Sequence, residues 1–98
     1  MEGRTVELHP EALTEAQAAL VWYQERNPAA SAAFRLEIDL AVNEISMSPE
    51  RWPVFMQGAR RFLLRRFPFA VIYRITPTAI QILAFAHMRR KPGYWKAR

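Results

Sequence analysis

The sequence predicts an α+β fold in which an N-terminal strand and an antiparallel helical hairpin pack on a C-terminal antiparallel β-meander. One observation is the order of the patterns, because an alternating segment precedes two amphipathic helices and three apolar strands (β-α-α-β-β-β). Another is the length, since 98 residues suffice for one hydrophobic core and leave no room for a second domain. We therefore expect residues 1–98 to form a single domain.

The first strand and helix are marked by local signals. Residues 4–8 alternate polar and apolar side chains, which is typical of a short strand. Pro10 is favoured at the first position of a helix, and the negative charge of Glu11 stabilises its first turn. Apolar side chains then follow helical spacing to about Arg26. Glu11 and Glu15 lie one turn apart, and we interpret them as a solvated acidic face.

A second helix is predicted directly after the first. Asn27 can cap its N-terminus and Pro28 can occupy its first position. Pro49 disfavours helical geometry at the preceding residue, so the helix should end near Ser48. Its apolar positions recur on one face, at Ala30, Phe34, Ile38, Ala41, Val42 and Ile45. The short turn between two amphipathic helices predicts an antiparallel hairpin.

Three more strands are predicted in the second half of the chain. Residues 49–59 contain two prolines and a glycine and are predicted to form a loop. The strands are expected at residues 60–66, 70–75 and 79–87, with turn residues between them. A basic, irregular tail follows at residues 88–98.

The last two predicted strands, 70–75 and 79–87, are apolar on both faces. A sheet with one face in water normally alternates apolar and polar side chains. We therefore expect the second face to be covered too, by the tail, by residues 49–59 or by another chain. Tyr94 and Trp95 are candidates to fold back over it. The position of the first strand within the sheet stays open.

Charge is divided unevenly along the chain. Residues 1–50 hold three arginines and nine acidic residues, a net charge of −6, whereas residues 51–98 hold eleven basic residues and no acidic one. A positive surface of this kind attracts nucleic acid, an acidic protein or the acidic half of its own chain. The last possibility would pair Arg61, Arg65 and Arg74 with Glu37, Asp39 or Glu44 on the second helix.

The composition excludes several classes of function. The chain has no cysteine, so disulfides, thiolate metal sites and thiol nucleophiles are excluded. No apolar run is long enough to span a membrane, and the N-terminus lacks the pattern of a secretory signal. We expect a cytoplasmic protein with no metal site, no small-molecule cofactor and no membrane partner.

Two motifs carry a resemblance to a known family. Residues 67–74 read Phe-Pro-Phe-Ala-Val-Ile-Tyr-Arg, and residues 84–90 follow the pattern Ala-x-x-His-x-Arg-Arg. With residues 60–62 and 80–82, these segments resemble the ParE/RelE superfamily of toxins from bacterial type II toxin–antitoxin systems. The order of the predicted elements is also that of this superfamily.

The resemblance implies a small toxin that inhibits growth until a cognate antitoxin neutralises it. The antitoxin typically wraps the toxin with an acidic, initially disordered segment, which agrees with the basic half and the doubly apolar strands. ParE-like members bind and poison DNA gyrase and are not nucleases. RelE-like members are metal-independent endoribonucleases that cut mRNA on the ribosome. A third hypothesis is a degenerate member that acts only as a binding module.

The RelE-like hypothesis requires a base, an acid and cations around the scissile phosphate. The catalytic candidates for it are His87, Arg61, Arg65, Arg89 and Tyr94. Arg61 and Arg65 share strand parity and hence one sheet face, and RelE-like toxins use a basic residue and a tyrosine in the tail. His87 has a second interpretation, as a hydrogen-bonded structural residue at the end of its strand.

The remaining basic and aromatic residues are candidates for partner binding. Those expected to bind a partner or nucleic acid are Arg60, Arg66, Arg74, Arg90, Lys91, Trp95 and Lys96. RelE-like enzymes often carry lysines near the first strand of the meander, whereas the only lysines here are Lys91 and Lys96. Because arginine is a poor proton-transfer group, this difference favours ParE-like inhibition of DNA gyrase over cleavage of ribosome-bound mRNA.

Overall fold

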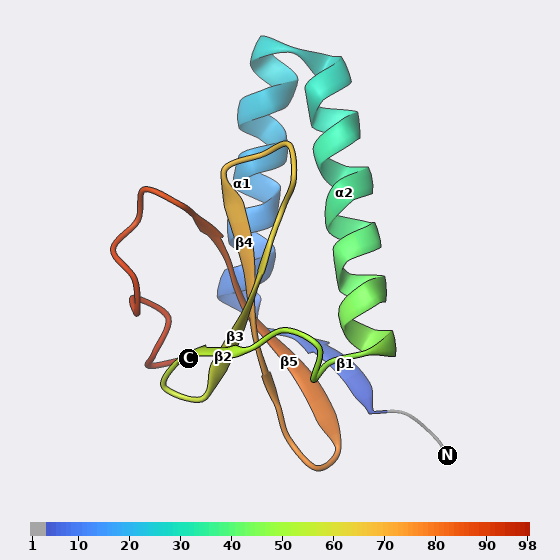
Figure 1. The fold of residues 1–98 in the computed structure, drawn as a ribbon. Helices are drawn as coiled ribbons and strands as arrows, with labels where there is room; N and C mark the ends of the chain where they lie inside the picture. Colours follow the sequence, from blue (N-terminus) through green and yellow to red (C-terminus); the bar gives the residue numbers. More distant parts are fainter. Residues whose placement is uncertain (1–3) are drawn as a thin grey trace.

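A five-stranded sheet carries the helical hairpin on one face (Figure 1). The computed structural model describes residues 4–98. Its elements are β1 (Thr5–Leu8), α1 (Pro10–Arg26), α2 (Pro28–Met47), β2 (Val54–Met56), β3 (Ala59–Leu63), β4 (Phe69–Ile75) and β5 (Ala79–His87). The strand order is β1-β5-β4-β3-β2, in which β1 runs parallel to β5 and the other neighbours are antiparallel. The α+β class and the hairpin are thus confirmed, and β1 is an edge strand.

Asn27 organises the turn between the two helices. Its backbone N–H donates to the carbonyl of Tyr23 at 2.6 Å and closes α1. Its side-chain Oδ1 accepts from the N–H groups of Ala29 and Ala30, at 3.1 and 3.4 Å, and caps α2. One residue therefore satisfies backbone groups of both helix ends, which explains why the hairpin needs no longer loop.

The main core lies between the hairpin and the sheet. Phe34 of α2 is fully buried, and its ring centroid lies 5.0–5.3 Å from those of Tyr23, Phe67 and Phe69. Three alanines of α1 are buried with it, at positions 12, 16 and 19. Small side chains on this face let α1 approach the sheet closely.

A second cluster covers the opposite face of the sheet. Ile72 and Leu83 are buried there under Trp95 of the tail, which is 3% exposed. Phe55 and Met56 of β2 pack at the border of this cluster. The chain itself therefore supplies the cover that the apolar strands predicted, through both the tail and the 49–59 segment, and the predicted return of Tyr94 and Trp95 over the sheet is confirmed.

The structure corrects the prediction that residues 49–59 form only a loop. Val54–Met56 is a strand that pairs with β3 through a tight turn. Gln57 and Gly58 both have positive φ values, 54° and 77°, as a two-residue hairpin turn requires. The prolines of this segment predicted a loop, and the strand beside them is only three residues long and bulged.

The predicted strand 60–66 is also corrected, because β3 ends at Leu63. The backbone N–H groups of Arg65 and Arg66 donate instead to Oε2 of Glu37 on α2, at 2.7 and 3.3 Å. The Glu37 carboxylate of α2 thus accepts hydrogen bonds that a neighbouring strand would accept if β3 continued. Within residues 4–98, no helix is long and apolar enough to cross a membrane, and no group of three or more acidic or histidine side chains has a metal-binding arrangement.

We predict that Phe34→Ala lowers the free energy of unfolding by about 3–5 kcal/mol, because it removes a buried ring and leaves a cavity among aromatic neighbours. Leu36→Ala is the matched control on the same helix, since Leu36 is 56% exposed and should cost far less. Urea unfolding followed by circular dichroism measures both. Equal losses for the two variants would contradict the packing described here.

Candidate functional site

The free part of the β5 edge defines the site. β1 pairs with Ala79–Ile82, and no other strand in residues 4–98 lies beside the rest of β5 on that side. Oε1 of Glu15 on α1 accepts from the N–H of Phe85 at 3.0 Å, and Nη1 of Arg98 donates to the carbonyl of Leu83 at 3.0 Å. The carboxylate of Glu15 and the side chain of Arg98 therefore bond to the backbone groups of β5 that have no neighbouring strand.

Glu15 also binds the tail. Its Oε2 accepts from the Tyr94 hydroxyl at 2.8 Å and from Nη2 of Arg98 at 3.0 Å, and Nη1 of Arg90 lies 3.6 Å away. The Arg90 guanidinium stacks 3.7 Å from the centroid of the Tyr94 ring. The side chains of Glu15 and Arg98 are only 15% and 13% exposed. Partial burial strengthens charge-assisted contacts, so this cluster anchors the tail on α1.

The hydroxyl of Tyr94 is held in its protonated form. Burial raises its pKa well above the ordinary value, and the hydrogen bond to the Glu15 carboxylate raises it further. Both effects disfavour the phenolate. Tyr94 is therefore a fixed hydrogen-bond donor and a weak acid.

A groove of about 580 Å³ lies between α1, the start of β4, the end of β5 and the tail. Its walls are mainly apolar and include Trp22, Phe69 and Phe85. Trp22 is 51% exposed, which is unusual for a large aromatic side chain. Arg89 and Arg90 form the rim on the tail side. The groove therefore combines an apolar surface with positive charge.

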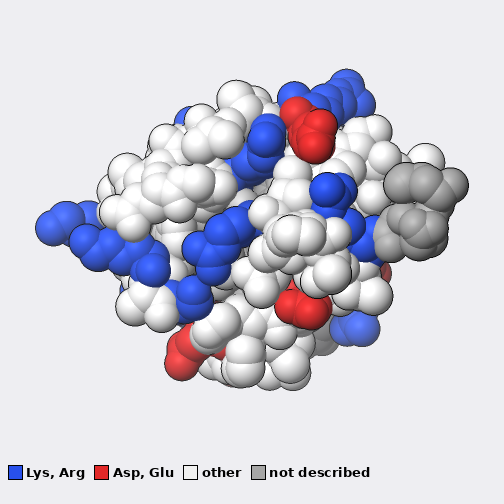
Figure 2. All heavy atoms as spheres, turned by 90° about the horizontal axis from the view of Figure 1, so that it is seen from below, with Lys and Arg blue, Asp and Glu red and all other residues white. Residues whose placement is uncertain are grey.

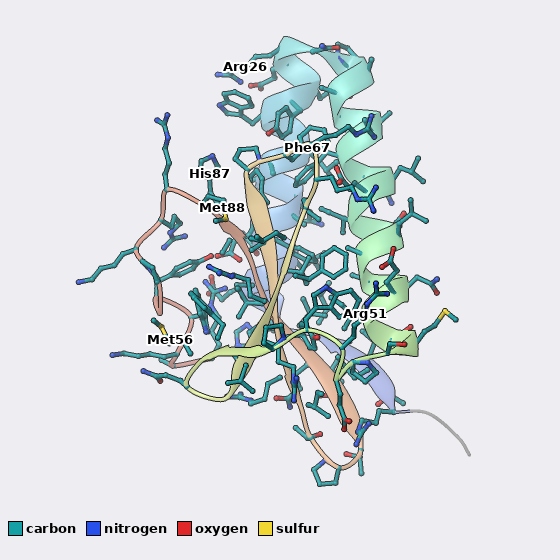
Figure 3. All side chains as sticks on the ribbon, in the orientation of Figure 1. Arg26, Arg51, Met56, Phe67, His87 and Met88 are labelled. Atoms are coloured by element: carbon teal, nitrogen blue, oxygen red, sulfur yellow. The ribbon has the colours of Figure 1, made fainter. Side chains whose placement is uncertain are left out.

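His87 stands at the end of β5 and lines this groove (Figure 3). Its Nδ1 accepts from the backbone N–H of Arg89 at 3.0 Å. Its ring meets that of Phe69 edge-on, with centroids 5.0 Å apart. These contacts fix the imidazole and support its structural interpretation, while Nε2 has no hydrogen bond to any residue from 4 to 98.

The structure brings together three of the five catalytic candidates. His87, Arg89 and Tyr94 line the groove, whereas Arg61 and Arg65 do not. Arg61 stacks on Phe55, with the guanidinium carbon 3.9 Å from the ring centroid. Arg65 lies beyond the end of β3, so the shared strand face expected for it and Arg61 does not extend that far.

Several predicted binding residues serve the fold. Nη1 of Arg60 donates to the carbonyls of Trp52 and Glu50, at 2.6 and 3.3 Å. Nη2 of Arg74 donates to Oε1 of Gln81 and to the carbonyl of Arg98. Trp95 is buried, as described above. Four candidates remain exposed, namely Arg66, Arg90, Lys91 and Lys96.

The expected pairing of the basic half with α2 is not observed. Among residues 4–98, no ion pair joins Arg61, Arg65 or Arg74 to an acidic residue of α2. The positive charge therefore stays largely on the surface. Figure 2 shows basic side chains gathered at the end of the molecule where the tail lies in Figure 1.

Two residues of the site were missed from the sequence. The sequence predicts that Glu15 is part of a solvated acidic face, and Trp22 is not among the predicted site residues. The signal for Glu15 was weak, because only its place beside the buried alanines of α1 marks it. Its partners Tyr94 and Arg98 lie 79 and 83 residues away in the chain.

The raised pKa of Tyr94 predicts how stability depends on pH. The folded protein holds this proton more tightly than the unfolded chain. The contribution of Tyr94 to the free energy of unfolding is therefore fully present below pH 10 and is lost as the pH rises above it. Burial also raises the pKa of Tyr23 and Tyr73, which act in the same direction. The Tyr94→Phe variant should lose less unfolding free energy between pH 9.5 and 11, measured in urea. The slope of its unfolding free energy against pH should be smaller by the equivalent of about one proton. An unchanged slope would contradict the assignment.

Comparison with known proteins identifies the family. A family model described as the ParE toxin of the type II toxin–antitoxin system parDE matches residues 6–92. A solved structure of a chromosomal ParDE toxin–antitoxin system from P. aeruginosa has the same fold, with a TM-score of 0.77 and 20% identity. That match covers 88% of this chain and 97% of the other. No curated protein matches the sequence. The chain belongs to the ParE family of type II toxins, which confirms the superfamily resemblance of its motifs.

Proposed function

We propose that this toxin inhibits DNA gyrase by protein–protein contact, and that the groove at the end of β5 is its docking site. The carrying observation is that the groove offers an exposed tryptophan and two exposed arginines, Arg89 and Arg90, while its tyrosine and carboxylate are bound to each other. This arrangement suits recognition of another protein. Membership in the ParE family supports the choice of gyrase.

The exposed groups of the groove are those that dominate protein interfaces. Tryptophan, tyrosine and arginine are enriched among the residues that supply most binding energy. Trp22 presents a large apolar surface, and the guanidinium of Arg26 stacks 3.9 Å from its ring centroid. Arg89 and Arg90 add charge on the opposite rim. A partner with an apolar side chain flanked by acidic groups would fit both features.

The same geometry argues against RNA cleavage. Cleavage through the 2′-hydroxyl needs a base on one side of the phosphate and an acid on the other. The Tyr94 hydroxyl donates a hydrogen bond to Glu15, and its pKa is raised, so it is a poor acid for the leaving oxygen. His87 and Arg89 alone do not supply the required pair.

We further propose that a cognate acidic antitoxin neutralises the toxin by covering this groove, and that the complex resides in the cytoplasm with its target. Carboxylates of the antitoxin would pair with Arg89, Arg90 and the neighbouring Lys91, all of which are exposed. Long-range attraction between opposite charges would accelerate this association. The antitoxin and gyrase would then compete for one surface.

A supercoiling assay with purified gyrase tests the proposal. The toxin should block supercoiling or accumulate cleaved DNA. Trp22→Ala combined with Arg89→Glu should raise the inhibitory concentration about tenfold or more, because a single hot-spot residue contributes about 2 kcal/mol. The matched control is Arg51→Glu, an exposed arginine that lies at the other end of α2 from the groove (Figure 3). It should inhibit as the wild type does.

Other outcomes identify the alternatives. The RelE-like endoribonuclease predicts a different pair of results. Supercoiling would be unaffected, and mRNA on programmed ribosomes would be cut at the A-site codon unless the variant is His87→Ala. These results would overturn the proposal. Absence of both activities, with unchanged growth on induction without antitoxin, would identify a degenerate member that acts only as a binding module.

A further inference from the structure

Strand β1 presents an open edge to solvent (Figure 1). Its bonds to β5 come from alternate residues, since the N–H of Thr5 donates to Thr78 and that of His9 donates to Ile82, at 3.2 and 3.0 Å. The backbone groups of the even-numbered residues point the other way, because N–H and C=O alternate sides along a strand. Arg4, Val6 and Leu8 therefore offer donors and acceptors at the edge.

The side chains of β1 leave apolar surface exposed beside that edge. Val6 and Leu8 pair in register with Ile80 and Ile82 and so face the helices. They remain 42% and 43% exposed. They border a second groove, of about 390 Å³, whose other walls come from α1 and α2 and include Leu13 and Val42.

The two edges of the sheet differ in their protection. At the far edge, β2 has only three residues and its pairing is bulged, which discourages a further strand. β1 is regular over Thr5–Leu8, with no bulge and no proline within it. Unprotected edges are where strands from other molecules add.

We propose that β1 pairs antiparallel with β1 of a second copy of this chain, which joins the two sheets across a two-fold axis at Val6. Val6 then lies opposite its own counterpart, Thr5 opposite Glu7, and Arg4 opposite Leu8. The outward backbone groups of all three even-numbered residues meet partners in this register. The inference goes beyond the proposed gyrase inhibition and does not depend on it.

Alternative registers are less favourable. A shift of two residues towards the C-terminus would set Glu7 directly opposite Glu7 of the second copy, and like charges in that position are destabilising. A shift of one residue would turn the apolar side chains to the wrong face. A shift towards the N-terminus would leave Leu8 without an opposite residue in β1.

Charge complementarity favours a second copy as the occupant. Arg4 of the second copy would lie opposite Leu8, which lines the same groove as Asp39 of α2. Arg35 lines this groove too and partly offsets the attraction. Asp39 is exposed and forms no ion pair with any other residue that the structure describes. Among the described residues, Arg4 forms one side-chain hydrogen bond, from Nε to the carbonyl of Thr76, and its terminal nitrogens form none. The two-fold axis would form this contact twice.

Sedimentation of the purified toxin tests the proposal. The wild type should show twice the chain mass of 11.4 kDa at micromolar concentration. Val6→Lys and Val6→Glu should each be monomeric, because the two-fold axis places the new charge of one copy opposite the same charge of the other copy. An equimolar mixture of the two should recover the doubled mass, since opposite charges then meet. Val21→Lys, at an exposed site of α1, is the matched control and should stay dimeric.

Cross-linking gives an independent readout, because the chain has no cysteine. Facing residues of a hydrogen-bonded antiparallel pair have Cα atoms about 5.5 Å apart, which a disulfide can bridge. Val6→Cys should give a covalent dimer under mild oxidation, whereas Val21→Cys should not. Each variant is first checked for the wild-type circular dichroism spectrum. A monomeric wild type, or a folded Lys and Glu mixture that stays monomeric, would overturn the proposal.

Discussion

Strand β5 is nine residues long, but β1 pairs with only its first four, and Glu15 occupies the edge that β1 leaves open. Unpaired backbone groups beside a core are costly, so something must satisfy them. One carboxylate oxygen of Glu15 accepts from the strand and the other holds Tyr94 and Arg98. A single side chain thereby couples helix, sheet and tail.

The arrangement of the tail follows from this constraint. With Tyr94 and Arg98 fixed to Glu15, Trp95 is placed over the second face of the sheet and is buried there. The residues between β5 and this anchor form the rim of the groove, so Arg89 projects from a short tethered segment. The same contacts that close the core therefore position the surface that we propose for partner binding.

The sequence predicted the helices and the last strand to within a residue or two, because caps, prolines and apolar spacing are local signals. It also predicted that both faces of the sheet are covered. It failed at Val54–Met56, where a tight turn joins a strand to β3, and at Glu15, whose partners are distant in the chain. Contacts of this range depend on the fold as a whole, and no spacing within a single helix encodes them.

The division of charge persists in the folded protein and explains what the groove can recognise. Arg60 and Arg74 donate hydrogen bonds to backbone carbonyls, and Arg98 forms an ion pair with Glu15, so part of the basic half is structural. Arg89, Arg90 and Lys91 at the start of the tail stay exposed, although Arg90 also lies 3.6 Å from Glu15. Hydration largely offsets the attraction of exposed charges at contact, so their main contribution is to steering and selectivity. The apolar wall at Trp22 must then supply most of the affinity for any partner that the arginines attract.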